Sequence, residues 1–127
     1  MIASDIMTHH VHTIGPDASI LEAARLLSQK RISGLPVVNG VGNMIGMLTE
    51  ADIISKAHRE GLKVSDIMST EIIAVTEETP VSEIALLLTE HRIKRVPVVR
   101  NGKLTGIVSR ADIVHAVAQG HLIIRHW

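Results

Sequence analysis

The chain lacks cysteine, phenylalanine and tyrosine, and it contains a single tryptophan among its 127 residues. Without cysteine there is no disulfide, no thiol redox chemistry and no thiolate metal site. The near absence of aromatic side chains excludes the stacking platforms that single-stranded nucleic acids use. Aliphatic side chains must therefore form the core. A hydrophobic content of 46% is enough for one compact domain or two small halves.

An excess of charge of one sign is also missing, because 13 basic residues balance 13 acidic ones. A balanced chain has no overall attraction for nucleic acid, so we expect no nucleic-acid partner. The apolar runs are only a few residues long, too short to cross a membrane. The first residues lack the basic start and apolar stretch of a signal peptide. We therefore expect a cytoplasmic protein without a membrane partner.

The sequence does contain an internal repeat that covers most of its length. Four segments recur at an offset of 61 residues that becomes 60 after one deletion: 4–7 and 65–68 (SDIM), 36–38 and 97–99 (PVV), 46 and 106 (Gly), and 51–53 and 111–113 (ADI). Each copy is too small to bury its own apolar faces. The repeat thus predicts one compact module of two copies, residues 1–60 and 61–119, related by a pseudo-twofold axis, with a C-terminal tail at 120–127.

Both copies show the same order of secondary-structure signals. Residues 11–14 and 71–75 are rich in β-branched side chains and are predicted as short strands. Helical spacing follows over 20–30 and 81–91, with Pro80 at a first helical position. Buried strands at 35–38 and 96–99 then lead into hairpin turns at Asn39-Gly40 and Asn101-Gly102. Each copy is predicted as β-α-β-β-α, an α+β fold with the sheets packed together and the helices outside. Gly61 is a plausible helix stop between the copies.

A hydroxyl residue followed three positions later by an aspartate ends each hairpin. Thr49 and Asp52 follow the apolar strand 44–48, and Ser109 and Asp112 follow 104–108. Taken alone, this pattern is an ordinary capping arrangement at a helix start. It also fits a nucleotide site, because a helix start attracts phosphate and an aspartate can accept bonds from ribose hydroxyls. The recurrence within a longer repeat favours the second interpretation.

These motifs resemble those of a tandem pair of cystathionine-β-synthase (CBS) domains, called a Bateman module, over residues 1–119. The resemblance rests on 5–7 (DIM), 31–38 (RISGLPVV), 46–53 (GMLTEADI) and their second copies. It implies a non-catalytic regulatory module that binds adenine nucleotides, AMP, ADP or ATP, in clefts between the repeats, with S-adenosylmethionine as a further possible ligand. It also implies a homodimer that signals energy state to an unidentified regulated protein. The alternative is a structural dimerisation or interaction module with degenerate ligand sites.

The resemblance implies two nucleotide sites that each combine residues of both copies. The first takes its hydroxyl and acid from the first copy and its other residues from the second: Thr49, Asp52, Met68, Ile72, Ile73, Lys94 and Arg95. The other is built the opposite way: Ser109, Asp112, Met7, Val11, His12, Ser33 and Gly34. The two cations predict tighter binding, or a more phosphorylated ligand, at the first site. A monophosphate, a nucleoside or no ligand is expected at the other. The same cations also fit solvated charges before an interior strand.

No catalytic or metal site is predicted. His9, His10 and His12 are close in sequence, but no acid or cysteine completes a ligand set at a known spacing. No nucleophile is accompanied by a base and an orienting acid, and no glycine-rich phosphate-binding fingerprint is present. We therefore expect the chain not to be an enzyme and to need no cofactor.

Overall fold

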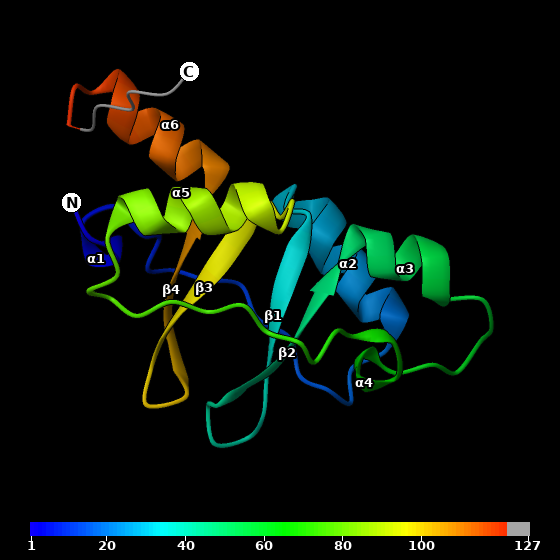
Figure 1. The fold of residues 1–127 in the computed structure, drawn as a ribbon. Coiled ribbons are helices and arrows are strands. Elements are labelled where there is room, and N and C mark those ends of the chain that lie inside the picture. Colours follow the sequence, from blue (N-terminus) through cyan, green and yellow to red (C-terminus); the bar gives the residue numbers. More distant parts are fainter. Residues whose placement is uncertain (122–127) are drawn as a thin grey trace. The chain divides into compact units, whose positions relative to one another are not determined.

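The computed structural model describes residues 1–121, and the predicted tail at 120–127 lies largely outside this range. The chain forms two compact units. The central unit is His12–Ile72, and the split unit combines Met1–Val11 with the chain from Ile73 onward. Each unit holds one two-stranded antiparallel sheet and helices, which confirms the predicted α+β class (Figure 1). No helix within residues 1–121 is long and apolar enough to span a membrane.

The central unit is built around one hairpin. Its elements are α2 (Ile20–Lys30), β1 (Gly34–Val38), β2 (Met44–Thr49), α3 (Glu50–Lys56) and α4 (Val64–Ile67). Helix α2 begins as predicted because the Ser19 side chain accepts a hydrogen bond from the Glu22 N–H at 3.1 Å. It ends at Lys30, and its C-cap, Arg31, adopts the left-handed conformation with φ 54°. The hairpin and α2 therefore match their predicted bounds to within one residue.

The split unit repeats this plan with segments from both ends of the chain. Its elements are α1 (Ala3–Ile6), α5 (Val81–Glu90), β3 (Arg95–Arg100), β4 (Lys103–Ser109) and α6 (Arg110–Ala118). Pro80 is the N-cap of α5, whereas the sequence predicts it at the first helical position, which Val81 holds. Its fixed φ of −59° suits either position, and the sequence signal cannot separate the two.

The compact units do not follow the boundaries of the sequence repeat. Helix α1 precedes the first hairpin in the chain, yet it belongs to the split unit, where Thr8 pairs with Ile107 of β4. Helix α4 likewise belongs to the central unit, where Ser69 pairs with Met47 of β2. In both cases the short SDI-containing helix, which the sequence does not predict, packs beside the second strand of a hairpin. Each hairpin is thus completed by a segment from the other copy of the repeat.

The predicted first strands at 11–14 and 71–75 are wrong in extent. Each is reduced to a single parallel bridge, Ile14 with Val37 and Val75 with Val98. Two hydrogen bonds hold the first of them, from the Ile14 N–H to the Pro36 carbonyl at 3.1 Å and from the Val38 N–H to the Ile14 carbonyl at 3.0 Å. The hairpin register shifts at the same place, between Val37 and Val38. The β-branched residues predict extended backbone correctly. How many of these residues pair with a neighbouring strand depends instead on the geometry of the hairpin.

The two hairpin turns differ by one deletion. Asn101 and Gly102 form a two-residue turn, and both have positive φ, 52° and 80°, as a type I′ turn requires. The first loop is longer, since β1 ends at Val38 and β2 begins at Met44. There the Asn39 side chain accepts from the N–H groups of Val41 and Asn43. The predicted Asn-Gly turn is confirmed in the second copy and replaced by a wider loop in the first.

The segment between the repeats also departs from prediction. Helix α3 ends at Lys56. Its C-cap, Ala57, lies four residues before the predicted stop at Gly61. Gly61 still has a positive φ of 80°, but it lies in the loop that leads to α4. A glycine with positive φ is typical of helix ends and of other turns, so the residue alone does not locate the helix end.

Each unit has its own aliphatic core, as the composition predicts. The central core is made of buried Ala23, Val37, Leu48, Leu62, Val64 and Ile67. The core of the split unit is larger and includes Val81, Ile84, Leu88, Val96, Val98 and Val108. No polar or charged side chain among residues 1–121 is fully buried. Hydrophobic burial therefore stabilises both units, while the polar groups of the predicted sites stay at the surface.

Candidate functional site

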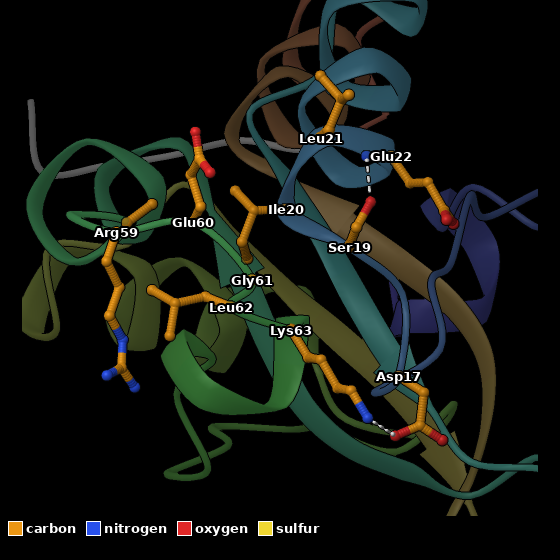
Figure 2. Close-up of a pocket in the computed structure, with 11 residues that line it drawn as sticks. Asp17, Ser19, Ile20, Leu21, Glu22, Arg59, Glu60, Gly61, Leu62 and Lys63 are labelled. Atoms are coloured by element: carbon orange, nitrogen blue, oxygen red, sulfur yellow. Dashed lines mark hydrogen bonds and ion pairs between the residues drawn. The ribbon is translucent and has the colours of Figure 1, made fainter.

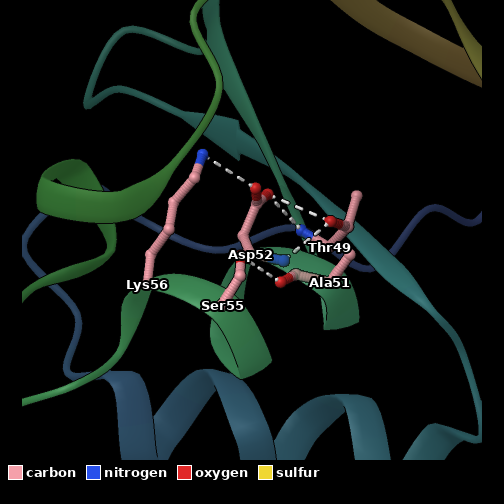
Figure 3. A network of polar contacts seen from close by, with 5 residues as sticks. All are labelled: Thr49, Ala51, Asp52, Ser55 and Lys56. Atoms are coloured by element: carbon pink, nitrogen blue, oxygen red, sulfur yellow. Dashed lines mark hydrogen bonds and ion pairs between the residues drawn. The ribbon is translucent and has the colours of Figure 1, made fainter.

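The predicted hydroxyl–aspartate pairs form two matching helix starts. Thr49 is the last residue of β2 and the N-cap of α3, where its side chain accepts from the Asp52 N–H at 3.2 Å. Asp52 returns the interaction, because its Oδ2 accepts from the Thr49 N–H at 2.9 Å and from Thr49 Oγ1 at 3.0 Å. Both residues are partly buried. Figure 3 shows this reciprocal arrangement at the start of α3.

The second helix start has the same geometry. Ser109 caps α6 by accepting from the Asp112 N–H at 3.2 Å, and Asp112 Oδ2 accepts from the Ser109 N–H at 2.8 Å. Both pairs are therefore capping boxes, which confirms the structural half of the interpretation. The caps orient each carboxylate but use only one of its two oxygens for the backbone.

Few amides at each helix start remain for a phosphate. The Glu50 N–H donates to the Ser33 carbonyl at 3.0 Å, and the Arg110 N–H donates to the Lys94 carbonyl at 3.0 Å. The next amides, of Ala51 and Ala111, have no acceptor within residues 1–121. One N–H at each helix start is thus available to an anion, and other donors must come from side chains.

Beside Thr49 in the central unit lie two residues that the resemblance assigns to the other site. Gly34 pairs directly with Thr49 across the hairpin, and Ser33 accepts the hydrogen bond from the first amide of α3. Lys94 and Arg95 have the equivalent places beside Ser109 in the split unit. Lys94 is exposed and Arg95 is partly buried. The predicted exchange of these pairs between the sites stays a prediction.

The two methionines each lie in the same unit as the hydroxyl–aspartate pair to which the resemblance assigns them. Met68 and Thr49 belong to the central unit, and Met7 and Asp112 belong to the split unit. A Cβ on Gly46 would lie 2.5 Å from Met68 Sδ, and one on Gly106 would lie 2.6 Å from Met7 Sδ. Each methionine therefore crosses the second hairpin strand where only a glycine leaves room. The glycine before each hydroxyl–aspartate motif has this structural role, which the motif alone does not reveal.

The other predicted residues are divided between the units. His12 and Ile72 belong to the central unit, and Val11 and Ile73 belong to the split unit. His12 is exposed, and the three aliphatic side chains are partly buried. Among residues 1–121, no three histidine, aspartate or glutamate side chains are arranged to hold a metal ion, and this includes the cluster around His9, His10 and His12.

Two cavities lie near these elements. One of about 390 Å³ is in the split unit, and its lining includes Met7, Asp112 and Ala116. Another of about 500 Å³ lies in the central unit, at the start of α2 (Figure 2). Some of the polar groups that line the second cavity have partners within residues 1–121. Ser19 caps α2, and Lys63 Nζ lies 3.9 Å from the exposed Asp17 carboxylate. Of these two cavities, the one beside Asp112 contains predicted site residues.

The duplicated hairpins, each followed by a capping box, define the class of protein: a tandem module in which each half has a helix that begins next to an aspartate. The chain belongs to the CBS domain family, whose model matches residues 3–59 and 64–119. It is 35% identical to the CBS domain-containing protein YhcV of Bacillus subtilis over 113 residues, which are 86% of this chain and 80% of that protein.

Solved structures of CBS domain pairs have the same fold. The structure of CBSX2 in complex with AMP matches with a TM-score of 0.88 and 30% identity, over 95% of this chain and 98% of that one. The CBS domain pair of protein MJ0100, in complex with 5′-methylthioadenosine and S-adenosyl-L-methionine, matches with a TM-score of 0.86 and 29% identity. It covers 94% of this chain and 98% of its own. These relatives bind adenosine-containing ligands.

Proposed function

We propose that this protein is a regulatory module that binds adenine nucleotides at its two helix starts and transmits their level to a partner protein. The observation that carries the proposal is the pair of capping boxes, in which an oriented aspartate lies next to an amide that has no acceptor within residues 1–121. Relatives of the same fold that bind AMP or S-adenosylmethionine support the ligand class. No catalytic activity is expected, and the cytoplasmic location stays an expectation from the sequence.

Isothermal titration calorimetry with AMP, ADP, ATP and S-adenosylmethionine tests the proposal. We expect the parent chain to bind at least one of them, and we expect Asp52→Ala and Asp112→Ala each to remove one binding event. The sequence predicts that Asp52→Ala removes the tighter event. A parent chain that binds none of the four ligands, or both variants titrating like the parent, would refute nucleotide binding at these helix starts.

The same titrations decide where the cations act. If Lys94 and Arg95 serve the Thr49 site, as the resemblance implies, Asp52→Ala removes the preference for ATP over AMP. If they serve the adjacent Ser109 site, Asp112→Ala removes it, because both cations lie beside Ser109 in the split unit. Charge-assisted bonds to phosphate are stronger than neutral ones, so the preference reports directly on the cations.

Exposed aliphatic side chains favour self-association as a second part of the proposal. Ile54 on α3 is 85% exposed, and its counterpart Val114 on α6 is 66% exposed. Leu21 and Leu86, on α2 and α5, are 59% and 60% exposed. Each unit therefore presents a large exposed apolar side chain on each of two helices, and covering these side chains in a homodimer would remove apolar surface from water.

We expect the parent chain to be a homodimer and Ile54→Arg to shift it toward monomer, as measured by sedimentation velocity. Arginine on a covered apolar face introduces a charge without a partner, whereas on a free face it is tolerated. Arg25→Ala on the exposed face of α2 serves as a control that changes charge but removes no apolar side chain. A parent chain that sediments as a monomer at all concentrations contradicts the homodimer.

A further inference from the structure

The two helix starts differ one turn after the aspartate. The residue four positions on is Lys56 in the first copy and Ala116 in the second. Residues four apart lie on the same face of a helix, so both side chains stand next to their aspartate. Lys56 Nζ donates to Asp52 Oδ1 at 3.1 Å (Figure 3). Ala116 is buried and has no group that could donate.

The two carboxylates therefore have different hydrogen-bond partners. Asp52 Oδ2 is bonded to Thr49, and Asp52 Oδ1 is bonded to the ammonium of Lys56. Asp112 Oδ2 is bonded to Ser109, and within residues 1–121 Asp112 Oδ1 receives no hydrogen bond. The Asp112 side also has room, since Asp112 and Ala116 line the cavity of about 390 Å³.

We propose that Lys56 controls ribose recognition at the Asp52 site, an inference that rests on the proposed nucleotide function. A ribose hydroxyl donates to Asp112 Oδ1 directly. At Asp52 the ammonium of Lys56 already occupies one acceptor position of the corresponding oxygen, and its charge makes that oxygen a weaker acceptor for the hydroxyl. The hydroxyl contact is consequently weaker at Asp52, and ligands held mainly through the sugar prefer Asp112. Lys56 is a specificity-determining residue that is absent from the hydroxyl–aspartate motif.

The size of this competition is limited by solvent. The side chain of Lys56 is 50% exposed, while that of Asp52 is 13% exposed, so the pair is screened on one side. Exposed ion pairs of this kind contribute little to stability, and replacing Lys56 leaves the capping bonds to Thr49 in place. A change of about threefold in hydroxyl-dependent binding is therefore expected.

The test compares AMP with 2′,3′-dideoxy-AMP, two probes with the same base and charge that differ only in the ribose hydroxyls. Asp112→Ala removes binding at the second helix start, so that calorimetry measures only the ligand bound at the Asp52 helix start. In that background Lys56→Ala and Lys56→Met are compared with Lys56. Methionine keeps much of the side-chain bulk without the charge, which separates ionic competition from steric blocking. The ratio of the two dissociation constants measures the hydroxyl contact.

We expect both Lys56 variants to raise the ratio, dideoxy-AMP over AMP, by about threefold. A rise with alanine but none with methionine overturns ionic competition, and an unchanged or lowered ratio in both variants overturns the proposal as a whole. Failure of the underlying function is distinguishable, since the unsubstituted chain then binds neither probe. Circular dichroism and thermal unfolding confirm that the variants are folded.

Discussion

Gly106→Ala is expected to destabilise the split unit by about 1–3 kcal/mol, the range for an overpacked site. The new Cβ would lie 2.6 Å from Met7 Sδ and 3.1 Å from the Thr8 carbonyl oxygen. The methionine can rotate away, but Thr8 is fixed by two backbone hydrogen bonds to Ile107, of 2.8 and 3.0 Å. The segment after α1 must therefore move away from β4. Urea unfolding monitored by circular dichroism measures the loss.

Two further variants make this result specific. A Cβ on Gly15 meets nothing within 4 Å, so Gly15→Ala should leave stability unchanged or raise it slightly through the unfolded state. Met7→Ala removes one of the two contacts, and the double variant should lose less stability than the sum of the single variants. If the two losses in the free energy of unfolding simply add, the Met7 side chain does not clash with the new Cβ at position 106.

Because Met7 is also a predicted ligand contact, Gly106→Ala connects the fold to the proposed function. A shift of the segment that carries Met7 changes the lining of the cavity beside Asp112. Nucleotide binding at that helix start should weaken even though neither Ser109 nor Asp112 is altered.

Ile84→Ala is expected to have the largest effect on stability, a loss of about 2–5 kcal/mol. Ile84 on α5 is fully buried and belongs to the core of the split unit. Truncation removes apolar contact and leaves a cavity that neighbouring aliphatic side chains fill only partly. Without aromatic residues the core has few large side chains, so each one matters more. The midpoint of urea unfolding is the measurement.

Leu86→Ala provides a matched control on the same helix. Leu86 is 60% exposed, so the same kind of truncation there should cost less than about 0.5 kcal/mol in the monomer. Equal losses from both variants would mean that α5 is not oriented as described. A larger effect of Leu86→Ala at high protein concentration only would instead indicate that this side chain is covered in a dimer.

Local patterns in the sequence were sufficient for helix α2, for the paired strands of both hairpins and for the starts of α3 and α6. Helix α2 was predicted at its observed bounds, because Ser19 and the spacing of apolar residues act within a few residues of the chain. The capping boxes at Thr49 and Ser109 are equally local, and the repeat doubled the signal. The turn at Asn101 and Gly102 was predictable because a type I′ turn requires positive φ at both positions, and asparagine and glycine adopt positive φ more readily than other residues. Such features depend on backbone sterics and on neighbours along the chain.

Contacts between distant segments were not predictable in the same way. The exchange of α1 and α4 between the copies depends on Met7 crossing Gly106 and Met68 crossing Gly46. Nothing in either copy indicates which hairpin its SDIM segment joins, because both copies contain the same SDIM motif and the same glycine in the second hairpin strand. Likewise, the ion pair of Lys56 with Asp52 follows helical spacing, but its significance emerges only by comparison with Asp112, which has no ion pair within residues 1–121.

The sequence by itself determined the aliphatic core, the duplicated α+β plan and the two hydroxyl–aspartate helix starts, since these depend on composition and short-range spacing. Only the tertiary structure decided how the copies divide into compact units, how far the first strands pair, and which aspartate oxygen has no hydrogen bond within residues 1–121. The physical reason is that packing between segments that are not neighbours in the chain, such as Met7 against Gly106, selects among partners that local propensity treats as equal.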